Sequence, residues 1–593
     1  MPVDITFRIG GAAGQGMQVI SHALGRMLAR NGYYAFATQD VMSRIRGGHN
    51  FASVRVSDQP VYAQRERCEV LLALDERTIE EHRKELVEHG VVVREQKLNP
   101  TGLEGHTVLA VPLEELATRF GGDTRMTNSV ALGAVLCLTG YPLEPLLNVL
   151  KDEFSHKGDD IVRRNQACAR GGYEFAQRTF RQTCPCRLPQ ISRPESRLFM
   201  SGAEAVGLSA VLSGLQFYAG YPMSPSTPIL EYLAARGPEH GVMVRQTEDE
   251  ISAINMALGA SWAGCRTMTG SAGGGFSLMT EGLSLAGMTE TPITIALCSR
   301  PGPATGLATR QAQADLLFAC HAGHGEFNRV IFAPGTAEQA VYATNQAFDI
   351  AEKYQVPALL LLDQHLNDSY WTQDPIDESH LIRQRYPAEA AGLEPYTYKR
   401  YSLAGNGDTP HASLDHLTTG PLDHSASPVS PLLRPGTPNQ VRCDDSDEHT
   451  EEGHIAESAE TRRAMVRKRL GKAAAISVEL ARPDCQPTER TKTVVLCFGS
   501  TYGVAREAVD NLTRKGASVS LMHLNEILPF PREAVLARLA KAQRIITIEG
   551  NATAQLARLV TTETRLKIAD SILKYDGRPF HVEEAERELD RLG

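Results

Sequence analysis

The stretch ITFRIGGAAGQGMQVISHALGRMLAR (residues 5–30) decides the fold class, because a strand, a glycine-rich turn and a helix follow one another in it. The helix is expected over Met17 to Arg30. Further strand signals follow at YYAFATQ (33–39), GVVVRE (90–95) and TVLAVPL (107–113), with helical segments after them. Strands that alternate with helices predict a parallel sheet. The sequence therefore predicts an α/β protein.

The chain is too long for a single hydrophobic core. Its 593 residues exceed the ~250 to 300 at which single domains usually stop growing, so three or four domains are expected. Shifts in composition predict an α/β domain over 1–185, a linker over 186–196, a second α/β domain over 197–380, a connector over 381–490 and a small C-terminal α/β domain over 491–593. Within the connector, one charged helix is expected over Glu457 to Leu480.

Composition and charge argue against several classes of function. Lys and Arg number 61 against 70 Asp and Glu, a net charge of −9, so there is no basic field for nucleic acid or an anionic membrane. The longest uncharged run, Ala205 to Leu230, is broken by glycines and prolines, and Asn128 to Leu143 is shorter than the ~18 to 20 residues of a spanning helix. The start, MPVDITFRIGG, lacks the features of a signal peptide. A soluble, cytoplasmic protein is predicted.

The eleven cysteines include no CxxC pair. Iron–sulfur clusters and structural zinc are usually held by clustered thiolates, so any cluster is expected on a partner rather than in this chain. Cys184 and Cys186 form a lone CPC, interpreted as unpaired thiols in a linker. Neither HAGHGE (321–326) nor DDSDEH (444–449) has the spacing of a metal site.

A glycine-rich turn separates the first strand from the first helix. It contains Gly10, Gly11, Gly14 and Gly16. Backbone N–H groups and a helix N-terminus in this geometry can hold a phosphate, but the spacing is not a strict GxGxxG. Asp40 follows the second strand, as in a dinucleotide site, whereas Arg44 and Arg46 favour a ligand with more phosphate. Phosphate binding and a merely tight turn both remain open.

Two loops in the second domain have the composition of a binding site. The loop GYPMSPSTPI (220–229) is fixed by three prolines and presents the hydroxyl of Ser224. Arg300 lies at the end of the strand-like segment ITIALC, and its planar fork suits a carboxylate. Ligands of open α/β sheets bind at such strand ends. An ordinary proline-rich turn and a surface arginine are the alternatives.

Three carboxylates precede an alanine-rich helix in RQTEDEISAINMALGASWAG (245–264). Thr247 and Glu250 have the spacing of a capping box, and acids suit the first turn of a helix. The alternative interpretation gives Glu250 a chemical role.

Taken together, these strings resemble the 2-oxoacid:ferredoxin oxidoreductase family, as a fused gamma–alpha subunit of the 2-oxoglutarate type. GGAAGQG and SRIRGGHN resemble the gamma domain, and GYPMSPST, QTEDEISAINMALGA and RPGPATGLAT resemble the alpha domain. DEHTEEGHIAE, EGNATAQLA and YDGRPF resemble the alpha connector and C-terminal domain. The resemblance implies a parallel-sheet gamma domain on the coenzyme A side, a thiamine-diphosphate-type pyrimidine domain and a transketolase-C-like domain.

The resemblance also implies an activity and a partner. Family members decarboxylate a 2-oxoacid with thiamine diphosphate, pass electrons to ferredoxin and release an acyl-CoA. The cofactor is shared with a beta subunit that carries the diphosphate, Mg²⁺ and a [4Fe-4S] cluster, and this chain has no GDG motif with a following Asn pair for them. A heterodimer, or a dimer of heterodimers, is expected.

Site residues follow from the resemblance position by position. Glu250 would face the aminopyrimidine, Ser224 the reacting carbonyl, and Arg300 and Thr309 the substrate carboxylate. Tyr221 and Pro222 would line the cofactor. The residues expected near coenzyme A are Gly11, Gly14, Gln15, Gly16, Arg46 and Asn128.

The sequence departs from the family pattern in the substrate loops. Ser224 replaces a threonine, Ala304 a serine and Ala308 a proline, and SAGGG (271–275) stands where TSGPG is usual. We expect 2-oxoglutarate as the substrate and succinyl-CoA as the product. Pyruvate, branched-chain and aryl 2-oxoacids are the alternatives, as is a non-catalytic CoA- or nucleotide-binding scaffold.

Overall fold

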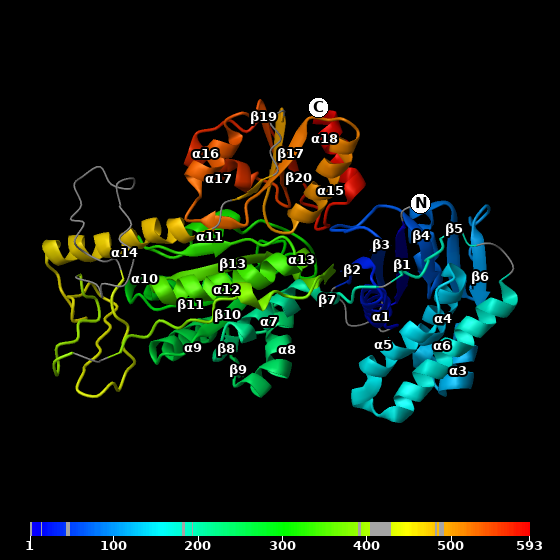
Figure 1. The fold of residues 1–593 in the computed structure, drawn as a ribbon, viewed down its shortest axis with the longest axis horizontal. Coiled ribbons are helices and arrows are strands. Elements are labelled where there is room, and N and C mark those ends of the chain that lie inside the picture. Colours follow the sequence, from blue (N-terminus) through cyan, green and yellow to red (C-terminus); the bar gives the residue numbers. More distant parts are fainter. Residues whose placement is uncertain are drawn as a thin grey trace.

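The computed structural model describes residues 3–592 apart from 13–14, 43–47, 181–183, 185, 193, 390–392, 404–428, 481–482 and 486–490. Figure 1 shows three α/β units: an N-terminal unit (blue to cyan), a central unit (green) and a C-terminal unit (orange to red) that lies over the junction of the other two. Each unit is built on one sheet. None of the described helices is both long and apolar enough to cross a lipid bilayer.

The sheet of the N-terminal unit has eight strands in the order β6-β5-β4-β1-β3-β2-β14-β7. β1, β4, β5 and β6 run parallel as predicted, whereas β3 is antiparallel to both β1 and β2. The strand β3 was missed because only parallel strands separated by helices were expected. It follows β2 with no helix among the described residues between them and pairs with it antiparallel. The strands are β1 (Asp4–Ala12), β2 (Tyr34–Asp40), β3 (His49–Ser57), β4 (Cys68–Ala73), β5 (Leu86–Glu95), β6 (Thr107–Val111), β7 (Leu198–Ser201) and β14 (Tyr370–Gln373).

Helices cover this sheet through their apolar faces. α1 begins at Met17 and ends at Arg30, as predicted, and buries Ile20, Leu24 and Leu28. The other helices are α2 (Glu76–His82), α3 (Leu113–Gly121), α4 (Thr127–Thr139), α5 (Glu144–Phe154) and α6 (Asp159–Thr179). Two strands of the sheet, β7 and β14, come from the segment expected to form a separate domain, so the N-terminal and central units share backbone pairing.

The sheet of the central unit has the order β18-β12-β13-β11-β10-β8-β9. Six of these strands, β8 to β13, run parallel to their neighbours, as expected for a second α/β domain. β11 and β13 are buried along their whole length, which explains their continuous apolar sequences. The strands are β8 (Phe217–Gly220), β9 (Met243–Gln246), β10 (Thr267–Ala272), β11 (Ile293–Ser299), β12 (Val330–Phe332) and β13 (Pro357–Asp363).

The helices of the central unit alternate with these strands along the chain, as in a parallel sheet that is covered by helices. They are α7 (Gly202–Leu212), α8 (Thr227–Arg236), α9 (Glu250–Trp262), α10 (Gly273–Met288), α11 (Leu316–His321), α12 (Ala337–Tyr354) and α13 (Gln364–Asp368). The connector contributes α14 (Ala459–Glu479), close to the predicted helix.

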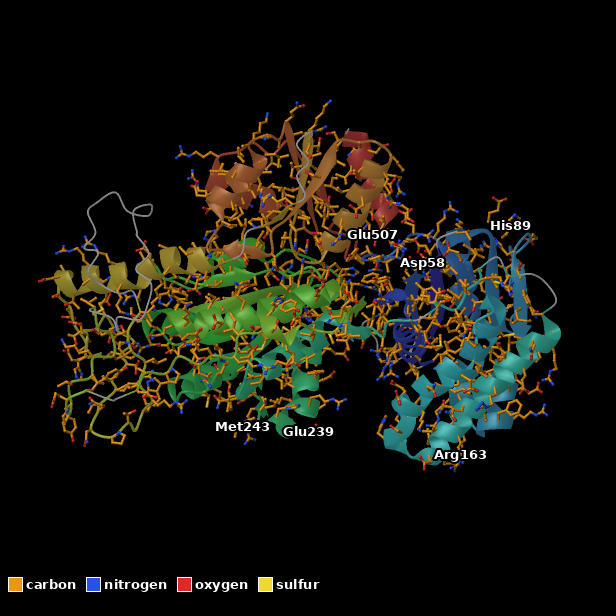
Figure 2. All side chains as sticks on the ribbon, in the orientation of Figure 1. Asp58, His89, Arg163, Glu239, Met243 and Glu507 are labelled. Atoms are coloured by element: carbon orange, nitrogen blue, oxygen red, sulfur yellow. The ribbon has the colours of Figure 1, made fainter. Side chains whose placement is uncertain are left out.

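The sheet of the C-terminal unit has the order β15-β17-β16-β19-β20. Its elements are β15 (Asp484–Cys485), β16 (Thr493–Cys497), β17 (Val519–His523), β19 (Arg544–Glu549), β20 (Asp570–Leu573), α15 (Thr501–Arg514), α16 (Arg532–Leu539), α17 (Gln555–Thr564) and α18 (Val582–Leu592). A seventh strand of the central sheet, β18 (Glu526–Leu528), also comes from this unit. Glu507 on α15 accepts a hydrogen bond from Arg55 Nη1 at 2.6 Å and joins the C-terminal and N-terminal units. Figure 2 labels Glu507 where the C-terminal unit meets the N-terminal unit.

Candidate active site

Glu250 is the first residue of α9, and its side chain is buried, with 3% exposed. The predicted capping box is wrong, because Asp249 caps the helix and accepts a hydrogen bond from Ser252 N at 2.7 Å. The Thr247 hydroxyl donates instead to the Asp249 carbonyl at 2.9 Å. Glu248 is exposed. The carboxyl of Glu250 is thus held inside the protein without serving the helix end.

The surroundings of the Glu250 carboxyl are formed by β10 and α10. Ser271 Oγ donates a hydrogen bond to Glu250 Oε1 at 3.3 Å. A Cβ atom at Gly275 would overlap both Ser271 Oγ and Glu250 Oε1. Gly275, the last residue of the SAGGG segment, therefore leaves the space that the carboxyl occupies.

Ser224 and Arg300 lie at the same edge of the central sheet. Arg300 Nη1 donates a hydrogen bond to the Ser224 carbonyl at 2.7 Å, so the loops after β8 and β11 are joined. Burial lowers the pKa of Arg300. The side chains of Tyr221, Pro222 and Ser224 are exposed. Because β9, β8, β10 and β11 are neighbours and parallel, Glu250, Ser224, Ser271 and Arg300 all lie at or near their carboxyl ends.

Thr309 lies at the junction with the N-terminal unit. Its hydroxyl donates to the Val41 carbonyl at 2.8 Å. Next to it, Arg310 Nη1 lies 2.5 Å from Asp40 Oδ1, and Arg578 Nε lies 3.2 Å from Asp40 Oδ2. Asp40 is therefore engaged by arginines of the other two units.

The glycine-rich turn brings several predicted residues together. Gln15 Oε1 accepts a hydrogen bond from Ala12 N at 2.7 Å, and Asn128 Nδ2 donates to the Gly16 carbonyl at 3.3 Å. Gly16 has a φ of 71°, and a Cβ there would overlap Asn128 Nδ2. Gly11 packs against Gln15 Oε1. Gly14, Arg44 and Arg46 lie outside the described residues.

A cavity of about 360 Å³ lies between the three units. The N-terminal unit contributes Asp40, Met42 and His49, the central unit Thr309, Arg310 and His365, and the C-terminal unit Arg578 and His581. Since His49 pairs with Ala12 across β3 and β1, the cavity lies beside the glycine-rich turn. Sequence reasoning missed the lining histidines, because they are far apart in the chain and share no motif.

Cys184 and Cys186 are unpaired as predicted, but they are not exposed linker thiols. Both are buried in the core of the N-terminal unit, with their sulfur atoms 3.4 Å apart. The hydrogen bond between the two thiols is the main cause that raises the pKa of Cys186, and burial raises it further.

Comparisons with known proteins show the family to which the chain belongs. Residues 6–175 match the family described as pyruvate ferredoxin/flavodoxin oxidoreductase, residues 209–468 its thiamine-diphosphate-binding domain, and residues 491–585 the core domain II of pyruvate:ferredoxin oxidoreductase. The 2-oxoglutarate synthase subunit KorA of Methanocaldococcus jannaschii is 30% identical over 60% of this chain and 88% of its own. This chain belongs to the 2-oxoacid:ferredoxin oxidoreductase family.

Other relatives extend the similarity over the full length. The alpha subunit of a 2-oxoacid:ferredoxin oxidoreductase from Sulfolobus sp. is 29% identical over 99% of this chain and 96% of its own. A solved structure, 2-oxoglutarate:ferredoxin oxidoreductase from Magnetococcus marinus with 2-oxoglutarate, coenzyme A and succinyl-CoA bound, superposes with a TM-score of 0.89 at 29% identity over 99% of both chains. The predicted α/β multidomain fold and the gamma–alpha arrangement of this 2-oxoacid:ferredoxin oxidoreductase subunit are confirmed.

Proposed function

We propose that this chain, with a beta subunit, catalyses the CoA-dependent oxidative decarboxylation of 2-oxoglutarate to succinyl-CoA and CO2, with electrons passed to ferredoxin. The observation that carries the proposal is the buried carboxyl of Glu250, which lies at the carboxyl edge of the central sheet with Ser224 and Arg300. Relatives named for 2-oxoglutarate support the choice of substrate.

The residues around Glu250 fit thiamine diphosphate. A buried carboxyl is needed to hold a proton at a pyrimidine nitrogen, and Gly275 leaves the space for it. Ser271 orients the carboxyl through Oε1. When bound, thiamine diphosphate supplies the carbon that adds to the 2-keto group. Tyr221 and Pro222, exposed in the loop after β8, are proposed to line the cofactor.

Arg300 is proposed to hold the carboxylate of the 2-oxoacid. One guanidinium nitrogen fixes the loop through the Ser224 carbonyl, and the planar group suits a carboxylate. Ser224 is proposed to donate its hydroxyl to the substrate carbonyl. Thr309 is proposed to border the substrate from the junction with the N-terminal unit.

Coenzyme A is proposed to bind between the N-terminal unit and the central unit. The turn with Gly11, Gln15 and Gly16 ends at the N-terminus of α1, where backbone N–H groups favour an anion. Asn128 Oδ1 is buried beside this turn without a hydrogen-bond partner among the described residues. The adjoining cavity reaches Thr309, so it connects the turn with the substrate loops.

A beta subunit with Mg²⁺ and a [4Fe-4S] cluster is the proposed partner. Large apolar side chains are exposed on the elements that carry the site, namely Tyr221, Met243, Ile251, Met256 and Leu278. Figure 2 shows Met243 at the outer surface of the central unit. Exposed large apolar side chains on the elements of a site are typical of a protein interface, and a heterodimer or a dimer of heterodimers would cover them.

Reduction of ferredoxin by the co-expressed subunits tests the proposal. A panel of 2-oxoglutarate, pyruvate, branched-chain and aryl 2-oxoacids should give the highest kcat/KM for 2-oxoglutarate, with strict dependence on coenzyme A. A preference for pyruvate would show that pyruvate, not 2-oxoglutarate, is the substrate, while the proposed reaction type would stand. If the complex binds coenzyme A but no 2-oxoacid drives reduction, the non-catalytic scaffold is the correct function.

A further inference from the structure

A cluster of metal-ligating side chains lies on the wall of the cavity beside the glycine-rich turn. His49 Nε2 and His82 Nε2 are 2.8 Å apart, and Glu81 Oε2 lies 4.0 Å from His49 Nε2. One ligand atom from each residue falls within 4.8 Å of the others. We infer that His49, His82 and Glu81 bind one divalent transition-metal ion of the zinc class. Nothing in the oxidoreductase function requires this site.

The fold presents these three residues from two elements. His49 is the first residue of β3, and Glu81 and His82 end α2. Gly10 makes the approach possible, because a Cβ there would overlap Thr78 on α2 and crowd the His49 ring. The ligands are therefore held by a strand and a helix rather than by a free loop.

The second ring nitrogen of His82 has the partner that zinc-binding histidines usually have. His82 Nδ1 lies 2.8 Å from Glu85 Oε2. Arg8 Nη1 lies 2.9 Å from the same oxygen, which favours an ionised carboxylate that accepts the hydrogen bond from His82 Nδ1. His82 Nδ1 then carries the proton, and the Nε2 lone pair points at His49. This is the carboxylate–histidine–metal arrangement.

His49 can present a lone pair to the same point. Its side chain is buried, with 3% exposed, and its Nδ1 has no hydrogen-bond partner among the described residues. His49 Nε2 faces His82 Nε2 at 2.8 Å. Without a metal the two rings share one hydrogen bond, and a metal ion between them would take the place of that proton.

The ligand set selects the class of ion. Two imidazoles and one carboxylate suit Zn²⁺ or Co²⁺ rather than Mg²⁺ or Ca²⁺, which prefer oxygen ligands. Bonds of ~2.0 to 2.2 Å place tetrahedral ligand atoms roughly 3.3 Å apart, between the two distances observed. Arg77 Nε donates a hydrogen bond to Glu81 Oε1 at 2.6 Å. The other carboxylate oxygen, Oε2, is nearer His49 and can bind the metal ion. A fourth position faces the cavity.

Titration of the chelator-treated full-length chain with Co²⁺ tests the inference. We expect one ion per chain, a visible absorption band of Co²⁺ with nitrogen and oxygen ligands, and displacement by Zn²⁺. His82→Gln should weaken binding at least ~100-fold and Glu85→Gln ~10- to 100-fold, the range for residues behind a metal ligand. Glu81→Gln should weaken it ~10-fold.

His89→Gln is the matched control. This imidazole is 75% exposed beside Glu88 on the same unit, far out on its surface in Figure 2, and its loss should not change Co²⁺ binding. The site would be refuted if His89→Gln weakened Co²⁺ binding as much as His82→Gln, or if His82→Gln did not weaken it at all. A thiolate-to-Co²⁺ charge-transfer band would also refute it, because it would show cysteine ligands. If His82→Gln does not fold, the half-exposed Glu81 provides the deciding variant. The measurement needs no partner and no turnover, so its result is independent of the proposed function.

Discussion

The Ser271 hydroxyl donates a hydrogen bond to Oε1 of Glu250 across 3.3 Å. This contact joins the end of β10 to the start of α9, and Gly275 on α10 leaves room for it because it has no side chain. Asp249 provides the helix cap, so Glu250 is not needed for the helix end. A buried carboxyl with no structural duty at its own helix is expected to act on a ligand.

Glu250→Gln should separate catalysis from stability. Glutamine keeps the shape and the contact with Ser271 but cannot exchange a proton with a pyrimidine nitrogen. Turnover of the complex should fall ~10²- to 10⁴-fold, the range for general acid–base groups, while thermal unfolding is unchanged. Steady-state kinetics and calorimetry measure the two effects. Glu248→Gln, at the exposed neighbour, should be silent, and an active Glu250→Gln enzyme would return Glu250 to a structural role.

Arg300→Lys should raise KM for the 2-oxoacid although the charge is kept. An ammonium cannot both hold the Ser224 carbonyl and bind a carboxylate in two-point fashion. The expected loss is ~1.5 to 3 kcal/mol in kcat/KM, the scale of hydrogen bonds to charged groups. The KM for coenzyme A should not change. Arg514→Lys, on the exposed side of α15, is the control, and equal kinetics in both variants would refute the assignment.

Gly16→Ala should weaken coenzyme A specifically. A side chain at a φ of 71° costs ~1 to 2 kcal/mol, and a Cβ there overlaps Asn128. The KM for coenzyme A should rise ~5- to 30-fold, with the KM for the 2-oxoacid unchanged. Gly105 has a φ of 87° and no neighbour within 4 Å, so Gly105→Ala introduces similar strain away from the turn. A coenzyme A effect of the same size in Gly105→Ala would show that strain alone is responsible.

The buried strands of the central sheet were predictable because they are short apolar runs that end in a turn. β11 (ITIALCS) and β13 (PALLLLD) are examples. The strands β7 and β14 were not, since they have four residues each and form only by pairing with a strand more than 150 residues away. Their pairing is a property of the tertiary structure.

The site was predictable only in part, for a similar reason. The structure brings Glu250, Ser224 and Arg300, which were named from motif resemblance, to one edge of the central sheet. The cap of α9 was misassigned, because Thr247 and Asp249 both satisfy capping rules and only the geometry distinguishes them. The ion pairs of Asp40 join three units and leave no local pattern in the sequence.

The connector helix α14 is held to the central unit by a fully buried ion cluster. Lys468 Nζ lies 2.6 Å and Lys472 Nζ 2.5 Å from Glu290 Oε2, and Glu290 is 1% exposed. Burial raises the pKa of Glu290, but the two ammonium charges outweigh it and the net pKa lies below 4.5. A carboxyl with a depressed pKa contributes stability that is present above its unfolded value, near 4.5, and is lost as the pH falls through the folded value.

Glu290→Gln should therefore destabilise the attachment of α14 at neutral pH. It leaves Lys468 and Lys472 buried without their anion, and because burial lowers the pKa of both amines, the loss of Glu290 favours their neutral forms. Removing one partner of a buried pair costs about 3 to 5 kcal/mol. The difference from the unchanged protein should shrink as the pH is lowered below 4.5, because the carboxyl is then protonated in the unfolded chain. Trp262 reports on the connector, since its indole donates to Asp444 at 2.7 Å. Urea unfolding between pH 7 and pH 4 gives the measurement, followed by tryptophan fluorescence in a Trp371→Phe background so that Trp262 alone reports. Glu114→Gln of the exposed Lys97 pair is the control. A pH-independent difference, or a midpoint that Glu290→Gln does not move, would mean that apolar packing alone holds the helix.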